Sequence, residues 1–162
     1  MIDNYIENTI FKDVGLAIKT TSSPIVKFAN SFVAKAGGIL SAVKAAGDCP
    51  GLEASLAAGG AASTNLADDK VRVYTLFAAV SPTDGAITLS WRHSADFGLT
   101  DVIQFCEDVN LGNKDDDMKY KARVGFVIIK NETGSAFVPG TTALDTANLT
   151  VTYISALGVF GK

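Results

Sequence analysis

The stretch that decides the fold is KARVGFVIIKNETGSAFVPGTTALDTANLTVTYI, residues 121–154. Its apolar run Ala122–Lys130 is followed by a polar turn, a Phe-Val-Pro-Gly corner and the alternating run Leu149–Leu157. Short runs rich in β-branched and aromatic residues, bounded by turn residues, are typical of β-strands. Between the two runs, Thr142 and Asp145 stand at capping-box spacing, which predicts one turn of helix. The stretch therefore predicts two strands joined by a long connection.

A central strand is predicted at Val71–Val80, whose sequence is VRVYTLFAAV. Apolar residues occupy both of its faces: Val71, Val73 and Phe77 on one, and Tyr74, Leu76 and Ala78 on the other. A strand that is buried on both sides lies inside a sandwich or at a seam between subunits. The Asp84-Gly85 pair then predicts a hairpin turn into a half-exposed strand that contains Trp91.

The remaining segments are shorter or less regular. Residues 1–13 are polar and predict an N-terminal arm or an edge strand, and Val14–Thr20 reads as a first strand. Gly37-Gly38 predicts a tight hairpin, because primed turns require positive φ. Residues 46–69 predict a long surface connection with a turn or two of helix at Leu52–Ala58.

The fold class follows from about seven short strands with turns between them. We expect a mainly β fold, an antiparallel β-sandwich or a jelly-roll-like barrel with an extended N-terminal arm. After the arm at 1–13, residues 14–162 form a single β domain with long loops at 46–69 and 93–119.

The composition points to contact with other proteins. Hydrophobic residues make up 48% of the chain and charged residues only 19%, so part of the apolar surface is expected against other subunits. The alternative is a fold rich in small residues, since its 15 glycines and many alanines do not form apolar surface patches. The predicted subunit-interface residues are Val71, Val73, Tyr74, Phe77, Trp91, Phe126 and Ile128.

Charge and hydropathy argue against two classes of partner. The net charge is −3 and the basic residues are scattered, whereas binding to nucleic acid requires clustered positive charge. No apolar run approaches the roughly 20 residues that cross a bilayer. The first residues carry acids and no apolar core of a signal peptide, so we expect synthesis and residence in a cytoplasm.

No motif in the sequence predicts catalysis or a bound cofactor. His93 is the sole histidine, and Cys49 and Cys106 are far apart, so a zinc site with about four ligands is not expected. His93, Ser94 and Asp96 are neighbours along the chain, and a catalytic triad needs residues from separate segments. We expect no enzyme activity, no cofactor and no metal, although the oxygen-rich loop 108–117 leaves calcium open.

Aromatic residues on strands leave a third role open. Trp91, Tyr74, Tyr120 and Tyr153 could form a platform for a sugar, as in a carbohydrate-binding β-sandwich module. Aromatic residues on strands more often belong to a core or an interface. Whether these aromatic side chains are exposed distinguishes the two interpretations.

Two parts of the chain resemble virion structural proteins of tailed bacteriophages. The C-terminal likeness lies in GFVIIKN at Gly125–Asn131, the element Phe137–Asp145 and TVTYI at Thr150–Ile154. The N-terminal likeness lies in GLAI at Gly15–Ile18, Lys27, Ala29–Phe32 and the Gly37-Gly38 hairpin.

The resemblance is to capsid decoration (cement) proteins and to head or neck fibres, which act as homotrimers. It implies a structural protein on the phage head surface, made in the bacterial cytoplasm, whose partners are its own copies and the major capsid protein. It also allows a head, neck or tail-associated fibre or adaptor. None of the matching segments carries a catalytic residue, so the resemblance implies no chemistry.

Overall fold

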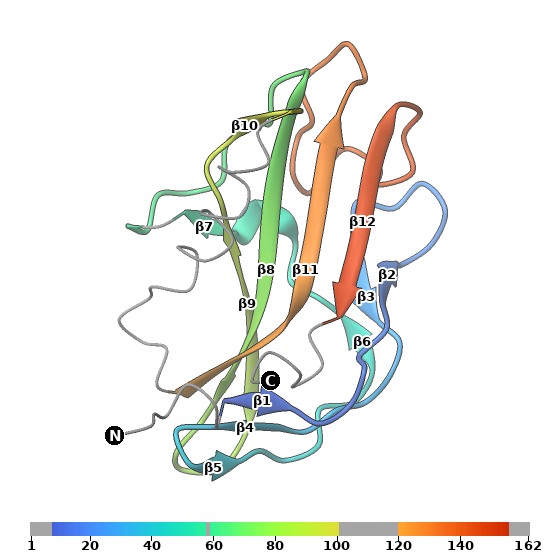
Figure 1. Ribbon diagram of the computed structural model, residues 1–162. Helices are drawn as coiled ribbons and strands as arrows, with labels where there is room; N and C mark the ends of the chain where they lie inside the picture. The colour runs from blue at the N-terminus through green and yellow to red at the C-terminus, as the bar shows by residue number, and fades with distance from the viewer. Residues whose placement is uncertain (1–7, 58, 101–119, 156–162) are drawn as a thin grey trace.

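The structure is a computed structural model that describes residues 8–57, 59–100 and 120–155. These residues form a mainly β fold with the short 3-10 helix η1 (Leu52–Ala54) (Figure 1). The long strands are β8 (Lys70–Val80), β9 (Ile87–His93), β11 (Lys121–Asn131) and β12 (Leu149–Ser155). The short strands are β1 (Thr9–Ile10), β2 (Leu16–Ile18), β3 (Val26–Phe28), β4 (Ala34–Ala36), β5 (Ile39–Leu40), β6 (Gly47–Asp48), β7 (Leu56–Ala57) and β10 (Phe97–Gly98).

The largest sheet has six strands in the order β12-β11-β8-β9-β7, with β10 paired to β8. Its neighbours are antiparallel except β7 and β9, which are parallel. β12 and β7 stand at opposite ends of this order, so the sheet is open and is not a closed barrel. β11 pairs with β8 from Lys121 opposite Ala79 to Asn131 opposite Lys70.

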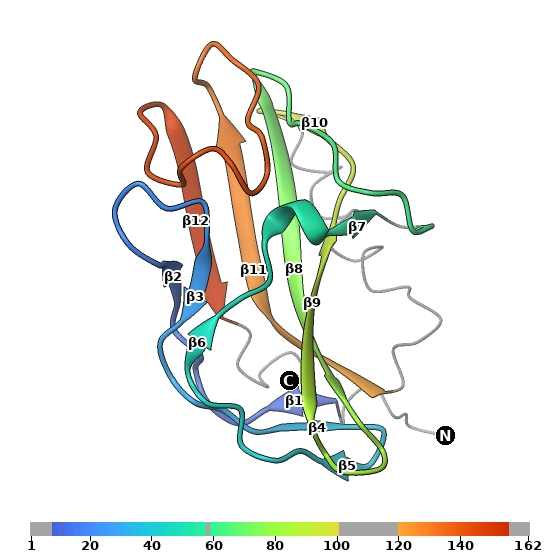
Figure 2. The same ribbon diagram turned by 180° about the vertical axis from the view of Figure 1, so that it is seen from behind.

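Two small sheets cover the large one. Figure 2 shows β2, β3 and β6, together with η1, in front of one face of the long strands, while β1, β4 and β5 lie at their lower end. Side chains from all three sheets share one apolar core, in which Phe28 from β3, Ala34 from β4 and Val127 from β11 are buried. The hydrophobic effect therefore joins the three sheets through a common core.

Gly125 shows how closely β2 approaches the large sheet. A Cβ at Gly125 would meet the Ile154 carbonyl oxygen on β12 and the Leu16 side chain on β2. The ladder between β8 and β11 is irregular between Arg123 and Gly125, where a bulge shifts which side chains face the core.

Several local predictions are confirmed. The strand predicted at Val71–Val80 is β8, and both of its faces are buried. Gly37 and Gly38 have φ of 59° and 76° and connect β4 to β5, as a primed turn requires. The turn before β9 contains Gly85 with φ of 71°.

The helical turn predicted at Thr142–Asp145 is wrong, because both side chains bond elsewhere. Thr142 Oγ1 accepts a hydrogen bond from the Val138 amide at 2.9 Å. The Asp145 carboxylate accepts one from the Ser22 amide at 2.9 Å, which ties this connection to the loop after β2. The segment consists of turns.

The segments predicted as arm and loops contain short paired elements. Thr9–Ile10 forms β1 at the edge of the β1-β4-β5 sheet. The connection 46–69 holds β6, η1 and β7, and its helix is shorter than predicted. In the loop 93–119, Phe97–Gly98 pairs with β8, and residues 101–119 lie outside the described part.

Candidate functional site

The predicted interface residues fall into two groups, one on each face of β8. Val71, Val73 and Phe126 form a second apolar cluster with Phe97, and the half-buried Ile128 packs against it. Phe77 lies on the same side of β8 by its alternation with Val73. It is 1% exposed.

Tyr74 and Trp91 lie on the opposite face, in the main core. Their rings make an edge-to-face contact, with centroids 6.5 Å apart and an interplanar angle of 85°. The Trp91 Nε1 donates a hydrogen bond to the Pro50 carbonyl at 2.7 Å. An indole held in this way is part of the core and is not an exposed sugar platform.

Burial within one chain changes how these seven residues are interpreted. All except Ile128 are buried in the single chain, so they offer little surface to another copy. Their place at a subunit interface stays a prediction. A contact between copies needs apolar groups that one chain leaves exposed.

Five large apolar side chains are exposed in the described residues: Phe11, Leu40, Val43, Leu56 and Ile154. Leu40 is 61% exposed and Phe11 is 60% exposed. Both belong to the β1-β4-β5 sheet or its direct continuation, at the lower end in Figure 1.

Strand alternation separates the two sides of this small sheet. Ile10 opposite Ala34 is buried in the core. Leu40, opposite Lys35, is on the other side, and so is Phe11, which follows Ile10 and donates to the Val33 carbonyl at 3.1 Å. Val43 is 69% exposed and directly precedes Lys44, which bridges to Phe32 just before β4. We call the exposed side chains of Phe11, Leu40 and Val43 the apolar end face.

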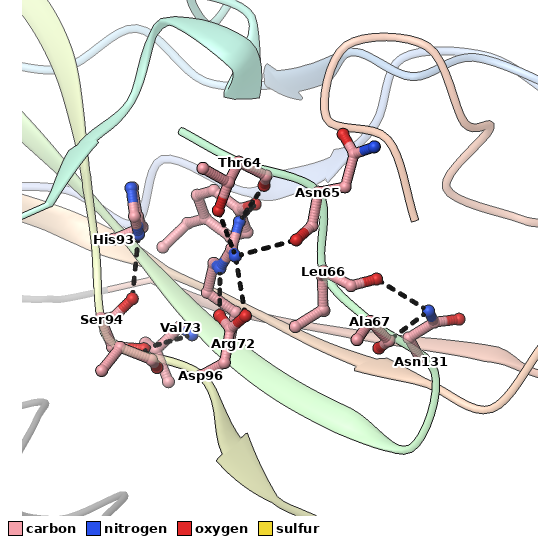
Figure 3. A network of polar contacts seen from close by, with 12 residues as sticks. Thr64, Asn65, Leu66, Ala67, Arg72, Val73, His93, Ser94, Asp96 and Asn131 are labelled. Carbon is pink, nitrogen blue, oxygen red and sulfur yellow. Dashed lines mark hydrogen bonds and ion pairs between the residues drawn. The ribbon is translucent and has the colours of Figure 1, made fainter. Parts of the chain in front are cut away.

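A buried polar cluster surrounds Arg72, which is 1% exposed and lies on the core face of β8 (Figure 3). Its Nε and Nη2 donate to the two Asp96 carboxylate oxygens at 2.6 and 3.0 Å. Its Nη1 donates to the Thr64 carbonyl at 2.6 Å and to the Tyr74 hydroxyl at 3.3 Å. The guanidinium thereby joins three chain segments.

The electrostatics of this cluster favour a charged Arg72 and a neutral His93. Burial opposes the Arg72 charge, but hydrogen bonds and charge from Asp96 and Tyr74 leave its pKa raised. Burial lowers the pKa of His93, and the nearby Arg72 charge adds to this. The His93 Nδ1 lies 2.9 Å from the Ser94 carbonyl, and Nε2 is buried without a partner among the described residues.

The same contacts show what the neighbours of His93 do. The Ser94 hydroxyl donates to the Ala95 carbonyl at 2.8 Å and accepts from the Val73 amide at 3.0 Å. Asp96 binds Arg72. These three residues are therefore not arranged as nucleophile, base and orienting acid; the cluster fixes segments around β8.

Sequence reasoning missed Arg72 and Asn131. Asn131 is fully buried, and its Nδ2 donates to the carbonyls of Leu66, Ala67 and Ser135 at 3.1, 3.1 and 2.8 Å. The signal in each case was a polar residue in or at the end of an apolar strand: Arg72 in VRVYTLF and Asn131 in VIIKN. Buried polar groups need partners, so such residues predict loop anchors.

Neither metal chemistry nor thiol chemistry gains support from the described residues. They contain no group of three or more His, Cys, Asp or Glu side chains placed to hold a metal. The acidic loop 108–117 and Cys106 lie outside the described residues. Cys49 is buried, and desolvation raises its pKa to about 12, which keeps the thiol protonated.

Comparisons with known proteins give no relative: no family model, curated protein or solved structure matches this chain. Within the described residues, no helix has the length and apolar character that would let it span a membrane.

Proposed function

We propose that this chain is a structural virion protein, a homotrimeric capsid decoration (cement) protein that binds the major capsid protein and stabilises the phage head. The observation that carries the proposal is the apolar end face. Phe11, Leu40 and Val43 are 60–69% exposed. Exposed apolar groups gathered at one end of a fold are typical of protein contacts.

The position of this face suits a contact between copies. It lies on the outer side of β1-β4-β5, at one end of the long strands (Figure 1). Contacts there leave the large sheet and the loops at its other end available to a shell. We assign the apolar end face to the trimer contact, ahead of the predicted residues of β8, β9 and β11, because all of those except Ile128 are buried in one chain.

The composition and the resemblance support the same function. Charged residues make up only 19% of the chain, and interface cores are depleted in charge. The resemblance to phage virion proteins includes Gly125–Asn131 in β11 and Thr150–Ile154 in β12, the two strands at one side of the large sheet. A protein that coats a shell in many copies can bind weakly at each site and still remain attached.

The finer fold assignment belongs to this proposal. The β2-β3-β6 sheet faces the large sheet across the main core (Figure 2), which supports a sandwich more than a jelly-roll-like barrel. In this interpretation, the two small sheets together form the smaller second layer of the sandwich.

Two alternative functions can be distinguished from a capsid decoration protein. A head, neck or tail-associated fibre or adaptor would share the trimer but occupy another place in the particle. A carbohydrate-binding module is less favoured, because Trp91 and Tyr74 are buried.

The test is to locate the chain by imaging particles that contain it. Density at the local three-fold positions of the shell is expected for a decoration protein. Density restricted to a vertex or to the tail junction would contradict that assignment and favour the fibre or adaptor.

A further inference from the structure

Lys35 lies at the centre of the outer side of the β1-β4-β5 sheet. On β4 it stands opposite Thr9 of β1 and opposite Leu40 of β5. Its neighbours Ala34 and Ala36 are fully buried in the core, so strand alternation places the Lys35 side chain on the same side as Leu40. Within the strands that form this sheet in the described chain, it is the only charged residue.

The Lys35 ammonium has no partner among the described residues. No ion pair or side-chain hydrogen bond there involves it, and the residue is half-buried. A surface that covers Phe11 and Leu40 also removes water from this charge. A desolvated ammonium costs free energy unless it meets an opposite charge. A partner that covers the apolar end face must therefore present a carboxylate to Lys35.

The charges at this end of the molecule favour a contact between two different surfaces. Positive charges predominate, so identical surfaces of two copies would repel each other across a two-fold axis. A three-fold axis brings two different surfaces of the chain together, as the trimer of the proposed function, on which this inference rests, requires. Among the described residues, the charged side chains nearest this end belong to Lys12, Asp13, Lys35, Lys44, Asp84 and Lys121.

One of the two carboxylates in this set is engaged elsewhere. Asp13 is hydrogen-bonded to Ser155, which lowers its pKa, and it accepts from the Gly15 amide at 2.8 Å. Gly15 precedes β2 and Ser155 ends β12, so Asp13 serves the contact between those strands. Asp84 is the other carboxylate of the set.

Asp84 lies directly beside the apolar end face. It belongs to the turn 81–86 between β8 and β9, which we call the hairpin turn. This turn packs against β5 (Figure 2), where the Ala42 amide donates to the Gly85 carbonyl at 2.9 Å. A Cβ at Gly85 would lie 3.4 Å from the Leu40 carbonyl oxygen. The hairpin turn and the face that contains Leu40 are therefore neighbouring surfaces at one end of the chain.

The Asp84 carboxylate is exposed and ionised. Hydrogen bonds from the Ser81 side chain and from the Ala86 amide, at 3.0 Å, lower its pKa. Within the described residues, no ion pair involves it. One chain thus carries an ammonium in the apolar end face and a carboxylate beside that face, and neither has a charged partner in the described chain.

We propose that, in the trimer, the apolar end face of each copy packs against the hairpin turn of the next copy, with the Lys35 ammonium opposite the Asp84 carboxylate. The arrangement closes after three copies, and every Lys35 and Asp84 then has a partner. The occupant is a second copy because the chain itself carries the complementary carboxylate next to the face. The apolar side chains stabilise the contact, and the ion pair selects which surfaces meet.

Exchanging the two charges tests this pair. Lys35→Glu alone, or Asp84→Lys alone, should raise the concentration at which the trimer dissociates by about tenfold or more, because like charges then meet in a covered contact. The double variant should return this concentration to within about threefold of that of the unchanged chain. Sedimentation velocity over a dilution series measures assembly, and circular dichroism confirms the fold.

Two further variants keep the test independent of folding. Asp84→Asn retains a side-chain oxygen that can accept from the Ala86 amide but loses the charge, so it should weaken the trimer without disturbing the hairpin turn. The matched control is Lys70→Glu, which makes the same change of charge at the other end of β8, where Lys70 is exposed. Assembly of this control should be unchanged.

The possible outcomes separate this pairing from the proposed function. A trimer that tolerates Lys35→Glu or Asp84→Asn, or that the double variant fails to restore, overturns the pairing and leaves the trimer in place. An unchanged chain that is monomeric overturns both. If Lys35→Glu forms the trimer but no longer attaches to the shell, Lys35 contacts the shell protein, and the pairing is also overturned.

Discussion

Asp96 holds Arg72 through both carboxylate oxygens, at 2.6 and 3.0 Å, and so joins the segment after β9 to the core face of β8. The Arg72 side chain is 2% exposed and that of Asp96 is 32% exposed. The pair is therefore strongly asymmetric: one charge is deeply buried and depends on the other.

Asp96→Ala should destabilise the fold, because it leaves the buried Arg72 charge without its carboxylate. Removing one partner of a buried pair costs about 3–5 kcal/mol, and the partial exposure of Asp96 places the expected loss near the lower value. The measurement is the free energy of unfolding in urea. The control is Glu132→Ala, whose partner Lys130 is 39% exposed and whose loss should be below about 1 kcal/mol. Equal losses in the two variants would contradict the role given to Arg72.

His93 should make stability fall as the pH decreases below its ordinary pKa of 6.5. Burial lowers its pKa in the folded chain, so below 6.5 the unfolded chain binds a proton that the folded chain does not. Above that pH both states are neutral, and His93 contributes no pH dependence. His93→Gln should therefore reduce the loss of stability between pH 7.5 and 5.0.

This comparison isolates one group, because His93 is the sole histidine. Asp13 and Asp84 have pKa values lowered from 3.8, so their stabilising contributions are lost only at lower pH. Urea midpoints at pH 7.5 and 5.0 provide the measurement. An unchanged pH dependence in His93→Gln would show that His93 takes up its proton as easily in the folded chain.

Gly125→Ala should disrupt the seam between β2, β11 and β12. The new Cβ would meet the Ile154 carbonyl oxygen, which is backbone and cannot rotate away, and the Leu16 side chain. Forced overpacking costs about 1–3 kcal/mol. Gly98→Ala is the control, since a Cβ there meets nothing within 4 Å, and its effect should stay within about 0.5 kcal/mol. Equal melting temperatures of the two variants in thermal unfolding would contradict this prediction.

Leu40→Asp should weaken the proposed trimer without unfolding the chain. Leu40 is 61% exposed in one chain, so its substitution leaves the core intact while placing a charge in the apolar end face. Thr88→Asp adds the same charge at an exposed position of β9 and should leave assembly unchanged. Sedimentation velocity measures the assembly state, and circular dichroism confirms the fold. If Leu40→Asp still forms the trimer, the apolar end face is not part of the contact between copies.

The sequence predicts the long strands well because their patterns are local. Val71–Val80 is apolar on both faces, and its boundaries agree with β8 within one residue. The Gly37-Gly38 turn is equally local, since its positive φ values need glycine. Such features depend on neighbours in the chain and can be read without knowing the fold.

The helix prediction at Thr142–Asp145 failed because it depends on a contact distant in sequence. Thr142 and Asp145 have helix-start spacing, but Asp145 binds Ser22 from the N-terminal region. Whether an apolar strand faces a partner or its own chain also depends on the other sheets. Val71, Val73 and Phe126 are apolar in either case, and their burial against Phe97 follows only from the packing.

The mass of the assembled protein in solution tests the central claim most directly. Light scattering coupled to size exclusion should give three times the 16.9 kDa of one chain at micromolar concentration. A chain that remains a monomer across this range would contradict the account of a protein that functions by assembling with its own copies.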